Sequence, residues 1–128
     1  MDPKNLRYAP THEWAARDGD MVTVGITKFA VEQLTDVTHV ELGSVGRPVT
    51  AGQPFGEVES VKSVNDLYAP VTGEIAAVNE KLATDPSLVT NDPLGAGWMV
   101  KIKVKSGATL DHLMTLDAYE KQIASEGH

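Results

Sequence analysis

Short alternating apolar segments, separated by frequent turn residues, constrain the fold of this chain more than any other feature. Residues 21–26 alternate and are rich in β-branched side chains, which is typical of a strand. The Asp18-Gly19 pair before them is a strong hairpin signal and faces a first strand at 12–16. Turn signals recur roughly every 8 to 12 residues, a spacing that predicts an antiparallel sandwich or barrel. The other predicted strands are 38–42, 47–49, 55–61, 67–70, 74–78 and 98–104.

Two further segments predict short helices. Thr27 is a good N-cap for a helix at 28–34, whose apolar residues recur at helical spacing until Thr35-Asp36 interrupts them. Residues 80–97 are rich in Asn, Asp, Pro and Gly and predict a loop, with a helical turn or two around 85–89.

The C-terminal part changes pattern beyond Ser106-Gly107. Apolar residues return at helical spacing, which predicts a helical tail at about 109–125, broken near Asp117. The core sandwich is then expected at about 11–105. We expect one domain over all 128 residues, long enough to bury a core without a disulfide or a structural metal.

The composition excludes several classes of function. The 18 acidic residues outnumber the 11 basic ones and give a formal charge of -7, so basic protein partners are expected and nucleic acid is not. There is no cysteine, hence no disulfide, thiol nucleophile or Cys-ligated metal. The four histidines, at positions 12, 39, 112 and 128, show no ligand spacing, so no metal site is expected.

The chain carries no sequence signal for a membrane. No run of 18 apolar residues occurs, and the residues after Met1 form neither a signal peptide nor an Arg-rich, acid-poor leader. We expect a bacterial cytoplasmic protein, with a processed mitochondrial form as the alternative.

Lys62 is where the sequence most clearly indicates chemistry. It lies between two alternating segments, eight residues before Pro70 and eleven before Gly73, the spacing of swinging-arm carriers that bear biotin or lipoyl on lysine. A hairpin tip presents an uncovered ammonium group to a modifying enzyme. The acylated side chain becomes a flexible tether that reaches roughly 14 Å from the backbone. Taken alone, a lysine in a turn is usually only a solvated charge.

The residues around Lys62 closely resemble the glycine cleavage system H-protein family. The resemblance rests on Glu59-Ser60-Val61-Lys62 and on the segment from Asp66 to Gly73, and it extends over nearly the whole chain. Three positions depart from the common pattern. Thr35 lies where the family commonly has Gly, Gly43 where it has Pro, and Leu94 where it has Tyr. The flanks of the lipoylation motif are Glu59, Ser60, Val61, Ser63 and Gly73, and further similar segments are 8–14, 24–27, 40–42 and 92–102.

The resemblance implies a lipoyl group in amide linkage to Lys62 and a lipoyl/biotinyl-type antiparallel β-sandwich, a barrel-sandwich hybrid, with short helices and a C-terminal helix. It implies a non-enzymatic carrier that takes the aminomethyl group of glycine from a pyridoxal-phosphate glycine decarboxylase to a tetrahydrofolate-dependent aminomethyltransferase. Dihydrolipoyl dehydrogenase would reoxidise the arm, and a lipoyl-attaching enzyme would install it. The lack of cysteine fits, because the cofactor supplies the sulfur. A monomer suits a carrier that visits three enzymes.

Glu13 and Asp66 are candidates for holding the loaded arm, with Thr11 as a hydrogen-bonding helper. The loaded arm ends in an amine that is cationic at neutral pH, and carboxylates beside it can bind that cation. The alternative is that both carboxylates are solvated charges at strand edges. A His12–Glu13 acid-base pair is not expected, because adjacent strand residues point to opposite faces.

Two other functions use a lysine in the same way. Biotin carriers usually place Met on both sides of the lysine, whereas Val61 and Ser63 flank Lys62. A Schiff-base enzyme needs a lysine whose pKa is depressed by burial or nearby cations, and the nearby Glu59 and Asp66 favour the ammonium form.

Overall fold

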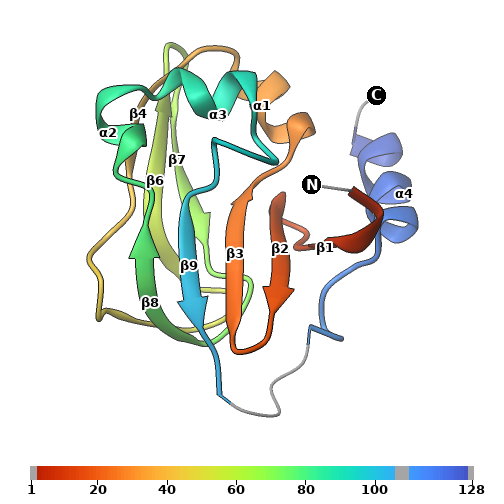
Figure 1. Ribbon diagram of the computed structural model, residues 1–128. Coiled ribbons are helices and arrows are strands. Elements are labelled where there is room, and N and C mark those ends of the chain that lie inside the picture. The colour runs from red at the N-terminus through yellow and green to blue at the C-terminus, as the bar shows by residue number, and fades with distance from the viewer. Residues whose placement is uncertain (1–2, 106–109, 127–128) are drawn as a thin grey trace.

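Two antiparallel β-sheets pack on a common core in the computed structural model, which describes residues 3–105 and 110–126 (Figure 1). The larger sheet has the strand order β1-β2-β3-β9-β8-β5, and the smaller has the order β4-β6-β7. The mostly β, antiparallel architecture predicted from the alternation is confirmed. The strands are β1 (Arg7–Tyr8), β2 (Glu13–Asp18), β3 (Met21–Ile26), β4 (Val37–Glu41), β5 (Pro48–Val49), β6 (Pro54–Ser60), β7 (Val64–Tyr68), β8 (Gly73–Val78) and β9 (Val100–Lys103).

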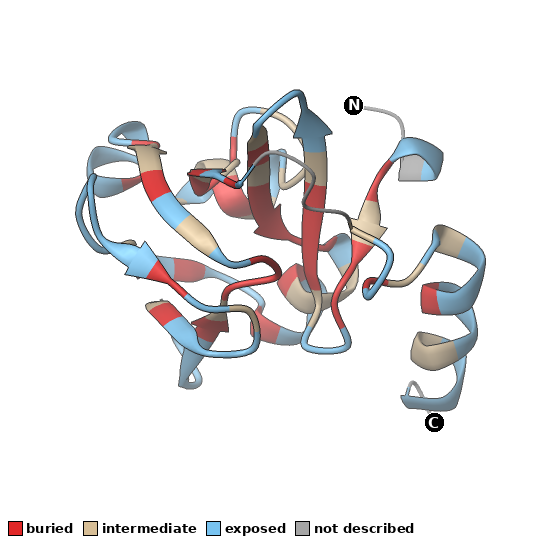
Figure 2. Ribbon diagram, turned by 90° about the horizontal axis from the view of Figure 1, so that it is seen from below, coloured by how far each residue is buried: buried red, intermediate tan, exposed pale blue. Residues whose placement is uncertain are grey.

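The core lies between the two sheets. In β3 the alternating Val22 and Val24 are fully buried, and Ile102 and Val100 of β9 lie opposite them. Val58 of β6 and other residues of the smaller sheet join the same apolar cluster. Figure 2 shows buried residues gathered along the strands, with exposed residues on the turns and over much of the C-terminal helix. Removal of this apolar surface from water stabilises the fold.

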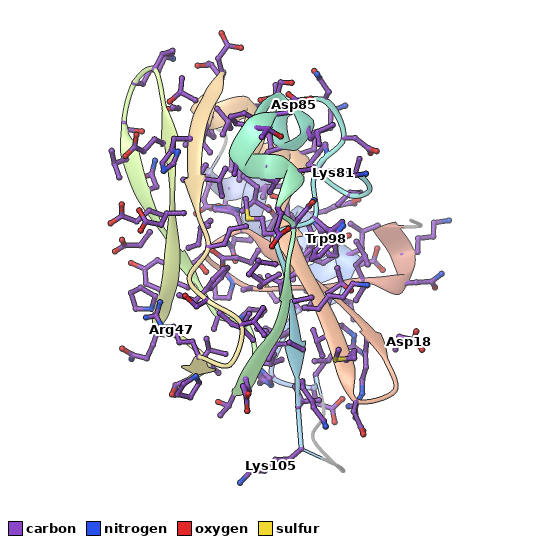
Figure 3. The ribbon with its side chains drawn as sticks, turned by 60° about the vertical axis from the view of Figure 1, so that its left-hand side comes forward. Asp18, Arg47, Lys81, Asp85, Trp98 and Lys105 are labelled. Atoms are coloured by element: carbon purple, nitrogen blue, oxygen red, sulfur yellow. The ribbon has the colours of Figure 1, made fainter. Side chains whose placement is uncertain are left out.

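Three short helices lie at one end of the sandwich. The helix predicted after Thr27 is confirmed as α1 (Lys28–Leu34), and the Thr27 hydroxyl accepts a hydrogen bond from the Ala30 amide at 3.3 Å. The loop before β9 contains α2 (Lys81–Thr84) and α3 (Ser87–Asn91). Figure 1 shows these helices at the same end as the β6–β7 turn, and Figure 3 places Asp85 at that end and Lys105 at the opposite one.

The C-terminal helix begins later than the apolar spacing predicts. Helix α4 spans Leu116–Glu126, and Asp117 lies in its first turn without breaking it. Residues 110–115 are not helical, because Met114 forms an isolated bridge with Tyr8. The expected helix start at 109, like the Ser106-Gly107 turn, lies outside the described residues. At the other end of the chain, a 3-10 turn, η1 (Pro3–Asn5), precedes β1.

Some strand boundaries also differ from the predictions. Strand β9 covers only part of the predicted 98–104, and β2 begins at Glu13 because His12 has a φ of 78°. The β6–β7 register shifts between Pro54 and Gly56, which marks a bulge or irregularity in this pair of strands.

Candidate functional site

Lys62 lies at the tip of the β6–β7 hairpin, as the sequence predicts. Strand β6 ends at Ser60 and β7 begins at Val64, and Lys62 is exposed. The Ser60 amide donates to the Ser63 carbonyl at 2.9 Å. The Ser60 hydroxyl accepts hydrogen bonds from the amides of Lys62 and Ser63, each at 3.2 Å. Ser60 therefore fixes the turn from which the Lys62 side chain extends.

The other residues of the turn anchor it or face outward. Val61 and Val64 are 66% and 58% exposed, so apolar surface flanks the lysine on both sides. The Val61 amide donates to the carbonyl of Asp36, just beyond α1, at 3.3 Å. The Ser63 hydroxyl accepts from the Asn65 side chain at 2.9 Å, and Glu59 pairs with Val64 in the ladder.

A cavity of about 310 Å³ opens beside this hairpin. One wall comes from the start of β2, a second from α1, and a third from β6 and β7. Its lining is mainly apolar. It is lined by Thr11, His12, Glu13, Ile26, Phe29, Ala30, Gln33, Leu34, Val58, Asn65, Asp66, Leu67 and Tyr68.

The cavity lies within reach of a group carried on Lys62. Asn65 and Asp66, both in β7, follow Lys62 by three and four residues. An extended chain covers at most about 3.5 Å per residue, so the nearest wall lies no more than roughly 10 Å from the Lys62 backbone. A lysine-borne tether of roughly 14 Å spans that length.

Glu13 is buried in the wall of this cavity and is only 2% exposed. One of its oxygens accepts from the Thr11 hydroxyl, and the other accepts from the Tyr68 amide at 3.2 Å. Burial raises the pKa of the Glu13 carboxyl from its ordinary 4.5 to about 7, against the opposing effect of these hydrogen bonds. The alternative that Glu13 is a solvated strand-edge charge is therefore wrong.

Asp66 lies at the rim and is exposed. The ladder places it opposite Glu57, and Glu57 opposite Glu41, so three carboxylates lie side by side across the smaller sheet. These residues also line a second hollow of about 280 Å³, next to Arg47, which Figure 3 labels. The solvated-charge reading of Asp66 is compatible with this position.

Asn65 is a cavity residue that the sequence reasoning missed. It lies opposite the buried Val58, and strand alternation puts the two on the same, inward face. The alternation of β7 around the buried Leu67 could have identified Asn65 as inward-facing.

His12 and Glu13 do not act as a pair. The Nδ1 atom of His12 lies 2.8 Å from the Tyr119 hydroxyl, and Nε2 lies 3.3 Å from a Glu126 carboxylate oxygen. The two ring nitrogens thus have partners on α4. The expected separation holds, although His12 precedes β2 and is not a strand residue.

The close packing of β8 on β9 explains why the motif has glycine at position 73. A Cβ atom at this position would lie 2.2 Å from the Lys103 carbonyl oxygen and 2.8 Å from a methyl group of Ile102. Only glycine lets β8 approach β9 this closely.

In the described part of the chain, no group of three or more His, Asp or Glu residues is placed to hold a metal ion. His128 lies outside it. Likewise, none of the helices in residues 3–105 and 110–126 has the length and apolar character needed to cross a membrane.

Comparisons with known proteins point to one family. The family model described as glycine cleavage H-protein matches residues 6–126. A glycine cleavage system H protein of Carboxydothermus hydrogenoformans is 46% identical over 125 residues, which cover 98% of this chain and 96% of the relative. One from Bacillus cereus is 46% identical over 117 residues, 91% of this chain and 92% of the relative. The crystal structure of a glycine cleavage system H protein from Mycobacterium marinum superposes with a TM-score of 0.87 at 39% identity, covering 96% of this chain and 99% of that one.

Proposed function

The chain belongs to the glycine cleavage H-protein family, and from that premise we propose that it carries a lipoyl group in amide linkage to Lys62. The observation that carries this proposal is the exposed Lys62 at the tip of the β6–β7 turn, beside a cavity with a mainly apolar lining. Exposure makes the lysine accessible to a lipoyl-attaching enzyme. It does not provide the burial that a Schiff-base lysine needs.

The proposed role is that of a non-enzymatic carrier. When bound, the lipoyl group supplies the disulfide sulfur that accepts the aminomethyl group of glycine together with two electrons. The chain presents this group to glycine decarboxylase, then to aminomethyltransferase, and then to dihydrolipoyl dehydrogenase. We place this exchange in the bacterial cytoplasm and assign the carrier to a monomer, which leaves the Lys62 hairpin free for each partner.

Between visits, the cavity beside the hairpin is the proposed dock for the loaded end of the arm. Ile26, Phe29 and Leu67 offer apolar contacts to the hydrocarbon part. The buried Glu13 carboxylate, held by Thr11, binds the terminal ammonium group, and Asp66 assists at the rim. A partly shielded charge-assisted hydrogen bond contributes roughly 1.5 to 3 kcal/mol, which is enough to hold the arm without trapping it.

The carrier proposal is tested with Lys62→Arg, which keeps the charge but offers no amine for lipoylation. We expect intact-mass analysis, on protein made with its lipoyl-attaching enzyme, to find one lipoyl group on the wild type and none on the variant. Carrier activity with the three enzymes should vanish, whereas stability should change by no more than about 0.5 kcal/mol because the residue is exposed. Full carrier activity of Lys62→Arg would exclude the proposal.

The dock is tested by loading lipoylated protein, removing the decarboxylase, and following spontaneous release of formaldehyde or ammonia. Glu13→Gln should release the cargo roughly tenfold faster or more, and Asp66→Asn should have a smaller effect. Glu57→Gln is the matched control, because Glu57 neighbours Asp66 on the ladder but does not line the cavity. Equal rates in wild type and all three variants would refute the dock while leaving the carrier assignment intact.

A further inference from the structure

Helix α4 directs three polar side chains at the segment that contains Glu13. Tyr119, Gln122 and Glu126 follow one another at intervals of three and four residues, so they share one helix face. Gln122 donates to the Pro10 carbonyl at 2.8 Å, and Glu126 lies 3.3 Å from the Nε2 atom of His12. The far end of the chain thus holds the residues on either side of Thr11.

Tyr119 is the buried member of this set, at 3% exposure. Its hydroxyl lies 2.6 Å from the Thr27 hydroxyl and 2.8 Å from the Nδ1 atom of His12. Thr27 is the N-cap of α1, one wall of the cavity, and His12 lies between Thr11 and Glu13 in another wall. A single oxygen atom from α4 therefore contacts both walls.

The donors and acceptors around this oxygen form one consistent chain. A neutral His12 whose Nε2 hydrogen faces the Glu126 carboxylate has Nδ1 as an acceptor for the Tyr119 hydroxyl. The Tyr119 oxygen can then accept from Thr27, which itself accepts from the Ala30 amide. Burial raises the pKa of Tyr119 to about 12, so its hydroxyl remains protonated and can donate at neutral pH.

The backbone conformation of His12 explains why contacts from α4 are needed at this position. His12 has a φ of 78°, a strained left-handed conformation that non-glycine residues adopt rarely. Such a conformation persists where the surroundings hold it. The Ala9 carbonyl accepts from the His12 amide at 2.9 Å, and the His12 carbonyl accepts from the Thr27 amide at 2.9 Å. The contacts of the His12 side chain with α4 further fix this turn, which places Thr11 beside Glu13.

We propose that Tyr119 is a positioning residue of the cavity, and that through its hydroxyl the C-terminal helix keeps the Glu13 wall and the α1 wall in register for the arm. This inference rests on the proposed dock. Tyr119 does not line the cavity itself, and it acts through His12 and Thr27.

The test uses Tyr119→Phe, which removes only the hydroxyl and retains the ring that stacks on Tyr8 at 4.7 Å. Loaded, lipoylated Tyr119→Phe should lose its cargo severalfold faster than the wild type. In the unloaded protein, the titration midpoint of the Glu13 carboxyl, measured by carbon-detected NMR, should fall toward its ordinary value because a looser wall admits water. The second readout does not depend on the arm.

Ile123→Ala is the matched control, because it weakens the packing of α4 in the same apolar cluster but leaves the Tyr119 hydroxyl in place. Both variants are compared well below their melting temperatures. The proposal is supported if Tyr119→Phe alone changes the release rate and the Glu13 titration. It is overturned if both variants behave alike, or if neither changes the titration. A shifted titration in Tyr119→Phe, with release unchanged in both Tyr119→Phe and Glu13→Gln, would support the positioning role and reject the dock.

Discussion

Burial of the Glu13 carboxyl determines both how tightly it holds a proton and what it can bind. Its pKa in the folded protein is about 7, against an ordinary value of 4.5. The folded state therefore binds this proton more tightly than the unfolded chain does. An incoming ammonium group stabilises the ionised form, so docking of the cargo at or below neutral pH is coupled to release of the proton.

The pH dependence of the unfolding free energy should reflect the raised pKa of Glu13. Because the folded-state pKa is raised, the contribution of Glu13 is present below about pH 4.5 and is lost as the pH rises to about 7. The full loss is roughly 3 kcal/mol for a shift of this size. We expect the difference in unfolding free energy between wild type and Glu13→Gln, measured by urea titration, to change by about that amount across this interval. A difference that stays constant with pH would show that Glu13 titrates at its ordinary pKa.

Cargo retention should have the opposite pH dependence. Only the ionised carboxylate attracts the ammonium group, so the advantage of wild type over Glu13→Gln in retaining cargo should grow as the pH rises from about 6 to 8. The ratio of the two release rates is the quantity to measure, because it cancels the pH dependence of the release chemistry itself. A ratio that is flat over this range would contradict the assignment of Glu13 as the ammonium ligand.

At the scale of the elements, Gly73 ties the motif to the packing of β8 on β9. A Cβ at this position would collide with the Lys103 backbone, which cannot move without disturbing the β8–β9 ladder. We expect Gly73→Ala to lower the free energy of unfolding by about 2 kcal/mol or more, measured in urea. Lipoylation of the folded fraction should be unchanged, since Lys62 lies in the turn between two strands of the other sheet. A stable Gly73→Ala protein that fails to accept lipoate would instead assign Gly73 to enzyme recognition.

The elements that sequence predicted well are those determined by neighbouring residues. Helix α1 and the β6–β7 turn follow from Thr27 and from alternation around Lys62, and both are found. The start of α4 was predicted wrongly because Met114 pairs with Tyr8, more than a hundred residues away, and such a bridge leaves no local signal.

The candidate site was predicted only in part, for the same reason. Lys62 and Thr11 could be identified from the motif and from adjacency to Glu13. The burial of Glu13 depends on α1 and β7 closing over the start of β2, which only the tertiary structure reveals. Thr35 shows another limit, because a β-branched residue with a φ of 65° at the end of α1 contradicts its local preference. It occupies a position where the resemblance leads one to expect glycine.

At the scale of the whole molecule, the proposed presentation of the arm and its proposed storage use the same end of the sandwich. The Lys62 turn and the cavity lie at the end of the sandwich where α1, α2 and α3 gather, and α4 braces the cavity from the side of β1 (Figure 1). In the proposed carrier, the tether on Lys62 is the part that moves between the partner enzymes and the cavity.

The charge of the molecule bears on how its partners approach. With a formal charge of -7, we expect attraction to basic surfaces on the decarboxylase and aminomethyltransferase, so the apparent KM for this carrier should rise with salt as that attraction is screened.

Glu41→Gln/Glu57→Gln removes two carboxylates from the smaller sheet, which bears the Lys62 hairpin, whereas Asp117→Asn/Glu120→Gln removes two from α4. Both pairs change the net charge equally. If partners approach the hairpin side, the first pair should raise KM at low ionic strength and flatten its salt dependence more than the second. Equal effects would mean that net charge alone steers the encounter, and a KM independent of salt in the wild type would mean that docking is mainly apolar, with Val61 and Val64 as the first contacts to test.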